Sequence, residues 1–261
     1  MANLVGFRFK DMNRLYHFTN FDAAFKIIES GKLRFSKTSN LNDIIESNRV
    51  LFQRIFSEKY IHEHNRLYAE NQLRSFQQIS FSQDVDNEEQ CVLGFDLHTM
   101  WGLYANKGYG VCLVFDKDKL NIPPNDYVNS VTYRDYVYQS YDFANKSKQG
   151  IDAELKRNIN NIFFTKRKEW ENEQEYRIIR RVKNIQQDEY LDISDSLSFI
   201  IICKDESLSG LESVFDGLRY KEFSSLKKSY PILSYEYGLD GYTLFENKME
   251  PIWAEHIGFF Y

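Results

Sequence analysis

The sequence contains few of the residues that crosslink a chain, with only 3 Cys among 261 residues. Cys91, Cys112 and Cys203 form no paired motif, and their odd number argues against the disulfide framework of a small secreted protein. Reduced thiols are typical of cytoplasmic proteins. We therefore expect this chain to work in the cytoplasm.

Long apolar runs are also missing. The longest apolar cluster, Phe199 to Cys203, is far shorter than the roughly 20 residues that a transmembrane helix needs. Residues 1–14 contain no apolar run followed by a small-residue cleavage site, as a signal peptide would. The sequence thus predicts no membrane partner.

Basic residues are fewer than acidic ones: the chain has 33 Lys and Arg and 38 Asp and Glu, which gives a net charge of −5. Proteins that bind nucleic acid over a broad surface need a concentrated positive field, so this balance argues against that class. A local basic site stays open, and the run Lys166-Arg167-Lys168 is the place for one.

Several familiar chemical fingerprints are absent. Gly108-Tyr109-Gly110 precedes a strand and opens no helix, so it does not predict a dinucleotide-binding turn. Neither a phosphate-binding Walker sequence nor a nucleophile elbow occurs. His62-Glu63-His64 holds two histidines two residues apart, which do not share a helix face, so we expect no metal.

The residues that are present predict a single mixed α+β domain. Alternating or continuous apolar segments predict strands, and apolar residues at helical spacing predict helices. We expect strands at residues 14–19, 33–36, 78–82, 111–115, 128–138 and 199–203, a hairpin over 233–245, a helix that ends at Gly31, and helical segments at 44–76, 99–106 and 153–164.

An acidic block runs from Trp170 to Ile179. Glu171, Glu173 and Glu175 alternate in it, and an extended strand would bring all three to one face together with Arg177. Neighbouring carboxylates would then have Cα atoms roughly 6.6 Å apart, close enough to act on one small ligand. A solvated edge strand with Glu-Arg pairs is the alternative, and spacing alone leaves both interpretations open.

Seven segments follow one another in a recognisable order: Leu15 to Thr19, Ile27 to Leu33, Leu41 to Asp43, Ser80 to Ser82, Met100 to Ala105, Gly110 to Phe115 and Trp170 to Arg177. This order resembles the bacterial DUF2971 family, which itself looks like a divergent member of the ADP-ribosyltransferase fold. The resemblance covers about residues 14–182. It implies a mixed split β-sheet core with an inserted helical segment, in one domain over residues 1–261 whose last part, 183–261, completes the sheet.

The resemblance also implies roles for individual residues around NAD. Glu175 matches the late-strand glutamate that stabilises charge on the ribose, and Glu173 completes a Glu-x-Glu pair that orients or deprotonates the acceptor. The implied cofactor-binding residues are the first-strand His17, the strand serines Ser80 and Ser82, Tyr104 as a ring that stacks on nicotinamide, and Arg34 at the diphosphate.

We therefore expect an NAD-dependent ADP-ribosyltransferase that consumes NAD as a substrate and modifies an unknown protein or nucleic-acid acceptor. A bacterial toxin or an anti-phage effector is the matching biological role, and assembly into a homo-oligomer is left open. Two alternatives remain: a catalytically silent module that binds nucleotides or proteins, and an enzyme similar to RNA 2′-phosphotransferases, for which Lys166-Arg167-Lys168 is the local hint.

Overall fold

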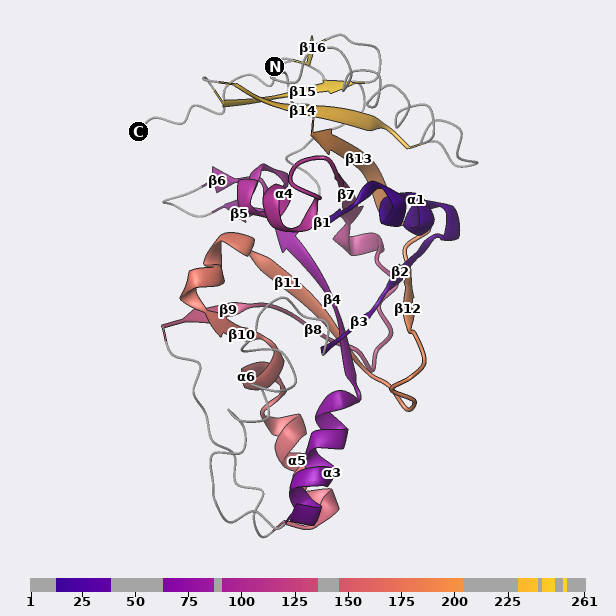
Figure 1. The fold of residues 1–261 in the computed structure, drawn as a ribbon, viewed down its shortest axis with the longest axis vertical. Coiled ribbons are helices and arrows are strands. Elements are labelled where there is room, and N and C mark those ends of the chain that lie inside the picture. Colours follow the sequence, from indigo (N-terminus) through magenta and orange to yellow (C-terminus); the bar gives the residue numbers. More distant parts are fainter. Residues whose placement is uncertain are drawn as a thin grey trace. The chain divides into compact units, whose positions relative to one another are not determined.

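The computed structural model describes residues 13–38, 63–86, 91–135, 146–203, 230–238, 241–246 and 251–252 (Figure 1). The chain divides into two compact units, and each is described by itself. The first comprises Met1–Lys32, Phe81–Asn121 and Asp192–Tyr261, and the second Leu33–Ser80 and Ile122–Leu191. Helices accompany strands that pair mostly antiparallel, which confirms the expected α+β class.

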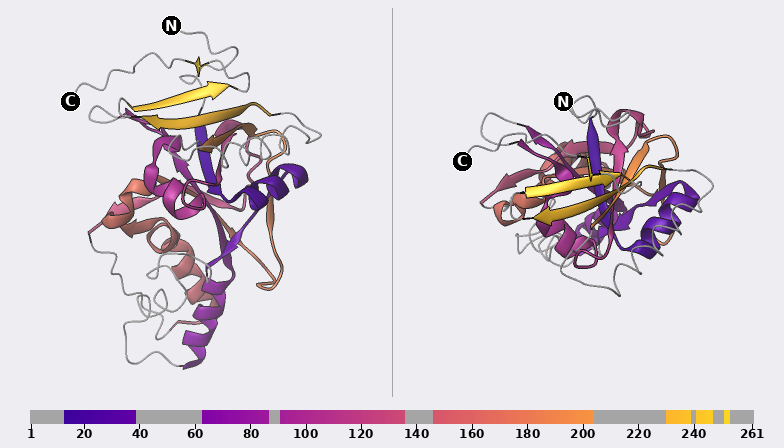
Figure 2. Two further views of the ribbon diagram at one scale, coloured as in Figure 1. Left: turned by 45° about the horizontal axis from the view of Figure 1, so that its top comes forward. Right: turned by 90° about the horizontal axis from the view of Figure 1, so that it is seen from above.

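The strands of the first unit are hydrogen-bonded in the order β16-β15-β14-β13-β7-β1. All these pairs are antiparallel except β13 with β14. The predicted C-terminal hairpin is present, with β14 and β15 side by side (Figure 2). The strands are β1 (Arg14–Thr19), β7 (Val111–Asp116), β13 (Leu197–Cys203), β14 (Ile232–Gly238), β15 (Gly241–Glu246) and β16 (Pro251–Ile252), and a separate pair joins β5 (Val85–Asp86) to β6 (Cys91–Val92).

Local capping signals fix the first helix, α1 (Phe21–Ser30). The side chain of Asn20 accepts a hydrogen bond from the Ala23 N–H at 2.8 Å, which satisfies one of the free donors at the helix start. Gly31 ends the helix with a φ of +64°, a left-handed conformation that glycine adopts without steric cost. The end at Gly31 agrees with the prediction from the sequence.

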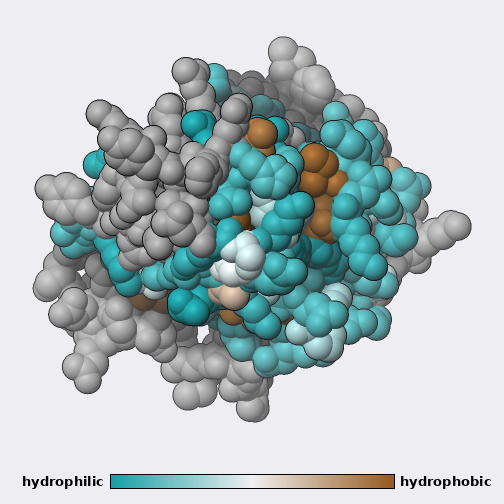
Figure 3. All heavy atoms as spheres, turned by 90° about the horizontal axis from the view of Figure 1, so that it is seen from below, coloured by the Kyte–Doolittle hydropathy of each residue, from teal (hydrophilic) through white to brown (hydrophobic). Residues whose placement is uncertain are grey.

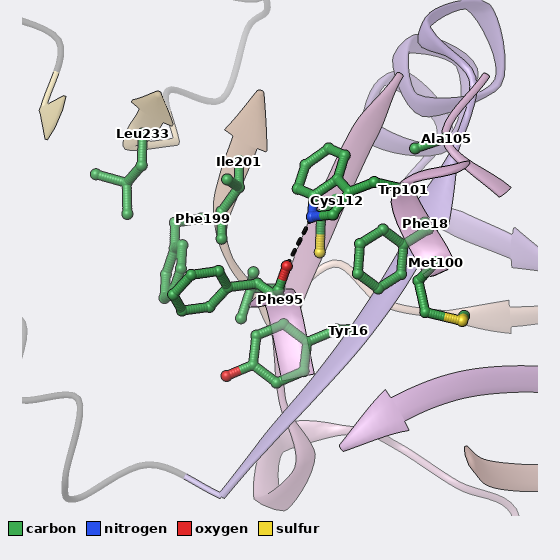
Figure 4. Close-up of a cluster of buried hydrophobic side chains, with 11 residues drawn as sticks. Tyr16, Phe18, Phe95, Met100, Trp101, Ala105, Cys112, Phe199, Ile201 and Leu233 are labelled. Atoms are coloured by element: carbon green, nitrogen blue, oxygen red, sulfur yellow. Dashed lines mark hydrogen bonds between the residues drawn. The ribbon is translucent and has the colours of Figure 1, made fainter. Parts of the chain in front are cut away.

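An aromatic cluster forms the core of the first unit (Figure 4). Its centre is Trp101 of α4 (His98–Tyr104), whose indole N–H donates to the carbonyl of Phe95 at 2.7 Å. Phe95 belongs to the short 3-10 helix η3 (Gly94–Asp96), and Phe18 meets the Trp101 ring edge-on at 5.2 Å between centroids. The bond satisfies the one polar atom of a buried indole, so the tryptophan packs without an unpaired donor.

In its described residues the second unit contains its own set of strands and three α-helices. β4 (Phe76–Gln83), which begins in this unit and ends in the first, is hydrogen-bonded to β11 (Glu175–Arg181), and β11 in turn to β8 (Tyr127–Ser130). The other strands are β2 (Lys32–Arg34), β3 (Ser36–Lys37), β9 (Thr132–Arg134), β10 (Thr165–Arg167) and β12 (Tyr190–Asp192). The helices are α3 (Glu63–Arg74), α5 (Lys148–Arg157), α6 (Ile159–Phe163) and the 3-10 helix η5 (Lys168–Glu173). A further 3-10 helix, η4 (Lys117–Lys119), belongs to the first unit.

The helices of the second unit differ in extent from the prediction. The helical segment expected over 153–164 is two helices, separated at Asn158, whose side-chain amide donates to the Glu154 carbonyl at 2.9 Å. Asparagine competes for backbone hydrogen bonds and so favours helix ends. The helix expected over 44–76 is described from Glu63 and ends at Arg74, while residues 44–62 lie outside the described residues.

A second apolar cluster lies between these helices and the strands. Phe76 of β4 contacts Phe163 of α6 with ring centroids 4.7 Å apart. This cluster fixes the end of α6, from which the strand β10 departs toward the acidic block. Its buried members are Ala69, Leu73, Phe76, Ile151, Leu155, Ile159, Ile162, Phe163, Phe164 and Ile179.

On the face shown in Figure 3 the described residues are mostly hydrophilic, and hydrophobic residues appear there in small, separate areas. Scattered apolar side chains of this kind are normal on a protein surface. None of the helices in the described part of the chain combines the length and the apolar character that a membrane span requires.

Two glycines of the first unit test this packing. An alanine Cβ at Gly110 would lie against the Thr19 carbonyl and 2.6 Å from the Ala105 carbonyl oxygen, whereas at Gly102 nothing lies within 4 Å. We expect Gly110→Ala to lower the free energy of unfolding by about 1–3 kcal/mol, as overpacking does. Gly102→Ala, inside α4, should raise it by about 0.5–1 kcal/mol. Urea unfolding measures the free energy of unfolding of both variants. Equal changes in the two variants would contradict the close packing around Gly110.

Candidate functional site

The acidic block begins as a 3-10 helix and only then becomes a strand. η5 ends at Glu173, Gln174 adopts a left-handed conformation with a φ of +46°, and β11 starts at Glu175. The prediction that Glu171, Glu173 and Glu175 share one strand face is therefore wrong, because strict alternation requires extended backbone throughout. Glu171 is exposed, whereas Glu173 and Glu175 are buried.

Lys166 of β10 brings these two buried carboxylates together. Its Nζ lies 2.6 Å from Glu173 Oε2 and 3.4 Å from Glu175 Oε2. The same ammonium lies 4.5 Å from the ring centroid of Trp170, at cation-π distance. Lys166 is 4% exposed, so it is an interior cation and not part of a solvated basic run.

Arg177 holds Glu175 from the other side. Its Nε donates to Glu175 Oε1 and its Nη2 to Glu175 Oε2, both at 2.7 Å, which is the bidentate geometry of a strong ion pair. Nη1 donates to the carbonyl of Phe163 at 2.6 Å. The two residues are neighbours on one face of β11, so this part of the predicted Glu-Arg alternation is correct.

Ser80 of β4 supplies a further hydrogen bond to the Glu175 carboxylate. The Ser80 Oγ also accepts from the side-chain Nε2 of Gln78 at 3.1 Å. An ionised carboxylate only accepts, so the serine hydroxyl must donate to Glu175 and the NH2 group of Gln78 must face the serine. The Oε1 of Gln78 then points elsewhere, and it has no hydrogen-bond partner among the described residues although Gln78 is 3% exposed.

The charges that the described residues contribute to this cluster are balanced. Burial opposes ionisation of Glu175, but Arg177, Lys166 and the hydrogen bond from Ser80 outweigh it and lower the pKa to about 2. The hydroxyl of Tyr133 accepts from the Glu175 N–H at 2.8 Å, and burial raises the pKa of this phenol, which keeps it neutral. Two cations thus face two carboxylates, with a neutral phenol beside them.

The edge of the cluster consists of uncharged side chains. Ser80, Tyr133 and Trp170 are half-buried, whereas the charged groups behind them are almost fully buried. Gln78, Tyr133 and Lys166 were not assigned to the site from the sequence, although Gln78 shares a strand face with Ser80 by simple alternation.

Three other residues implied by the resemblance, His17, Ser82 and Tyr104, belong to the first unit. His17 of β1 is half-buried and meets the Phe81 ring at 6.0 Å between centroids. Tyr104, at the end of α4, is half-buried and packs against the aromatic core. Ser82 is fully buried, and its Oγ has no hydrogen-bond partner in the part of the chain described. The structure thus brings Ser80, Glu173 and Glu175 together within the second unit.

Arg34, the implied diphosphate contact, is an exposed residue of the second unit. Its Nη1 lies 3.7 Å from Asp188 Oδ2, a surface ion pair of the kind that contributes little to stability. Within the described ranges no group of three His, Cys, Asp or Glu side chains is arranged to hold a metal ion, and His62 lies outside these ranges.

The ion pairs of Glu175 predict a pH-dependent stability. Because its pKa in the folded protein, about 2, lies below the usual value of 4.5, its contribution to stability is complete above about pH 4.5 and is lost as the pH falls toward 2. At pH 7 we expect Glu175→Gln to lower the free energy of unfolding by about 3–5 kcal/mol, since Arg177 stays buried without its carboxylate.

The exposed Glu171→Gln is the matched control and should change this free energy by no more than about 0.5 kcal/mol. Urea unfolding at several pH values measures both variants. The gap between wild type and Glu175→Gln should narrow as the pH drops below 4.5. A gap that is constant with pH would show that the carboxylate charge does not hold the cluster.

No curated protein and no solved structure matches the chain. Residues 100–178 match a family model whose description is protein of unknown function (DUF2971). The matched segment contains Lys166, Glu173, Glu175 and Arg177, the four charged residues of the cluster. The match supports the family assignment that the order of motifs predicted: over residues 100–178 the chain is similar to the DUF2971 family.

Proposed function

We propose that this protein is an NAD-dependent ADP-ribosyltransferase in which Glu175 is the catalytic carboxylate. One observation carries the proposal: a serine on one strand donates to a buried, ionised glutamate on the neighbouring strand, with a second glutamate held beside it. Ser80, Glu173 and Glu175 are the residues that the resemblance assigns to the reacting part of NAD, and they meet in one cluster.

The chemistry suits a carboxylate that stays ionised. When the bond between ribose C1′ and the nicotinamide nitrogen breaks, the electron pair leaves with nicotinamide and the ribose gains oxocarbenium character. A negative charge beside the sugar stabilises this transition state more than the ground state. Because Arg177 and Lys166 lower the pKa of Glu175 to about 2, the carboxylate carries its charge throughout the physiological range.

Glu173 has a different role in the proposal. It would orient the acceptor and take its proton as the new bond to C1′ forms, which is general-base catalysis. The acceptor is a protein or a nucleic acid, in the cytoplasm, and a toxin or anti-phage effector remains the proposed biological role. A free, buried thiol at Cys112 is compatible with that compartment.

Contacts to the rest of NAD are part of the same proposal. Gln78 would accept a hydrogen bond from the substrate through its unpartnered Oε1. The proposal keeps His17, Ser82, Tyr104 and Arg34 as the cofactor-binding residues that the resemblance implies.

A matched pair of substitutions tests the assignment. Both glutamates are buried and both pair with Lys166, so Glu175→Gln and Glu173→Gln disturb the same cluster. We expect Glu175→Gln to slow nicotinamide release from NAD by about 10²-fold or more. Glu173→Gln should abolish transfer to the acceptor but leave release to water within about tenfold of wild type.

The measurement is release of nicotinamide from labelled NAD, with and without cell lysate as the source of acceptor. Folding of each variant is checked by circular dichroism. If both variants lose nicotinamide release equally, Glu175 has no catalytic role distinct from that of Glu173. A folded wild type that neither binds nor consumes NAD would refute the proposed activity.

A second candidate is a module that binds a nucleotide without turnover. The observation that favours it is the bidentate pair, in which Arg177 donates to both oxygens of Glu175. A carboxylate so engaged must share its remaining lone pairs with any ribose hydroxyl. Saturable NAD binding by calorimetry, without any nicotinamide release, would establish this candidate in place of the transferase.

A further inference from the structure

Lys166 lies between the two buried carboxylates, with its Nζ 2.6 Å from Glu173 Oε2 and 3.4 Å from Glu175 Oε2. We propose that Lys166 selects the acceptor, restricting it to an uncharged nucleophile such as a hydroxyl or a nucleobase nitrogen and excluding a guanidinium or ammonium group. This inference rests on the proposed transferase function, and it names the chemical class of the second substrate.

The charge balance of the cluster is the first argument. Among the described residues, Lys166 and Arg177 contribute two positive charges to the cluster and Glu173 and Glu175 two negative charges, and each of these residues is no more than 5% exposed. A cationic acceptor would add an uncompensated positive charge beside two buried cations, which costs both desolvation and repulsion. An uncharged nucleophile leaves the balance intact.

Lys166 is also held firmly in place. Its Nζ lies within hydrogen-bond distance of both carboxylates and over the Trp170 ring. Its backbone belongs to β10, which pairs with β9 so that Lys166 lies opposite Tyr133, the residue whose hydroxyl accepts from the Glu175 N–H. An incoming cation would have to displace Lys166 from two ion pairs and an aromatic face at once.

The proton balance agrees with an uncharged acceptor. The nucleophile attacks ribose C1′ with a lone pair, the bond from C1′ to nicotinamide breaks, and neutral nicotinamide leaves with the bonding pair. The proton of the nucleophile passes to the Glu173 carboxylate and then to solvent. A hydroxyl or a nucleobase nitrogen offers its lone pair directly, whereas a guanidinium must first lose a proton beside the Lys166 ammonium.

The test replaces Lys166 and asks whether a cation then enters. Agmatine, a small alkylguanidinium compound, is the probe, and the proteins are wild type, Lys166→Met and Lys168→Met. Lys168 is the matched control because it lies two residues away in the same basic run and is exposed. We expect millimolar agmatine to raise the Tm of Lys166→Met by about 2–4 °C and to leave the other two unchanged.

With NAD present, Lys166→Met should also transfer ADP-ribose to agmatine, whereas wild type should not. Stabilisation of wild type by agmatine, or failure of Lys166→Met to respond, would overturn the inference. If Lys166→Met does not fold, Lys166→Gln takes its place, with the same expected results.

The two readouts separate this inference from the proposed function. The Tm shift requires no turnover, so it decides whether Lys166 excludes cations even if no protein in the series consumes NAD. Absence of nicotinamide release together with the expected Tm shift would refute the transferase and keep the cation-excluding role. If wild type releases nicotinamide and transfers ADP-ribose to agmatine, the transferase function is kept and the cation-excluding role of Lys166 is refuted.

Discussion

The second unit depends on the ion pair between Glu175 and Arg177. Through Arg177 Nη1 the pair is tied to the Phe163 carbonyl at the end of α6, and through the Glu175 main chain to Tyr133 and to the Val131 N–H. The two residues of this pair therefore anchor a helix end and the connection between β8 and β9. Buried ion pairs contribute little net free energy, but the loss of one partner is costly, so the pair acts mainly by fixing a single arrangement.

Much of the fold follows from local signals that the sequence states openly. Asn20 and Gly31 mark the ends of α1, and the apolar run of β7 marks a buried strand, because each of these features acts within a few residues. Glu173 could not be placed this way. Its position depends on the left-handed conformation of Gln174. Glutamine rarely adopts a positive φ, so the sequence does not predict this turn.

The candidate site was predictable in part. The resemblance assigned Ser80 and Glu175 to the same site around NAD, and in the structure Ser80 forms a hydrogen bond with the Glu175 carboxylate. Lys166 was grouped with Arg167 and Lys168 because lysine is almost never fully buried unless it is paired. Its partners, Glu173 and Glu175, lie on the far side of a turn whose geometry the sequence does not reveal. The same limit applies to Gln78, whose importance follows only from the donor and acceptor order of its neighbours.

The closeness in sequence of the charged residues has a consequence for how the chain folds. Phe163, Lys166, Glu173, Glu175 and Arg177 lie within one short stretch, so their contacts close only small loops and cost little chain entropy. Ser80 is far away in the chain and must join by a long-range contact. We expect the ion pairs of the cluster to form early in folding, before β4 packs against them. No unpaired charge would then be buried in the transition state for folding.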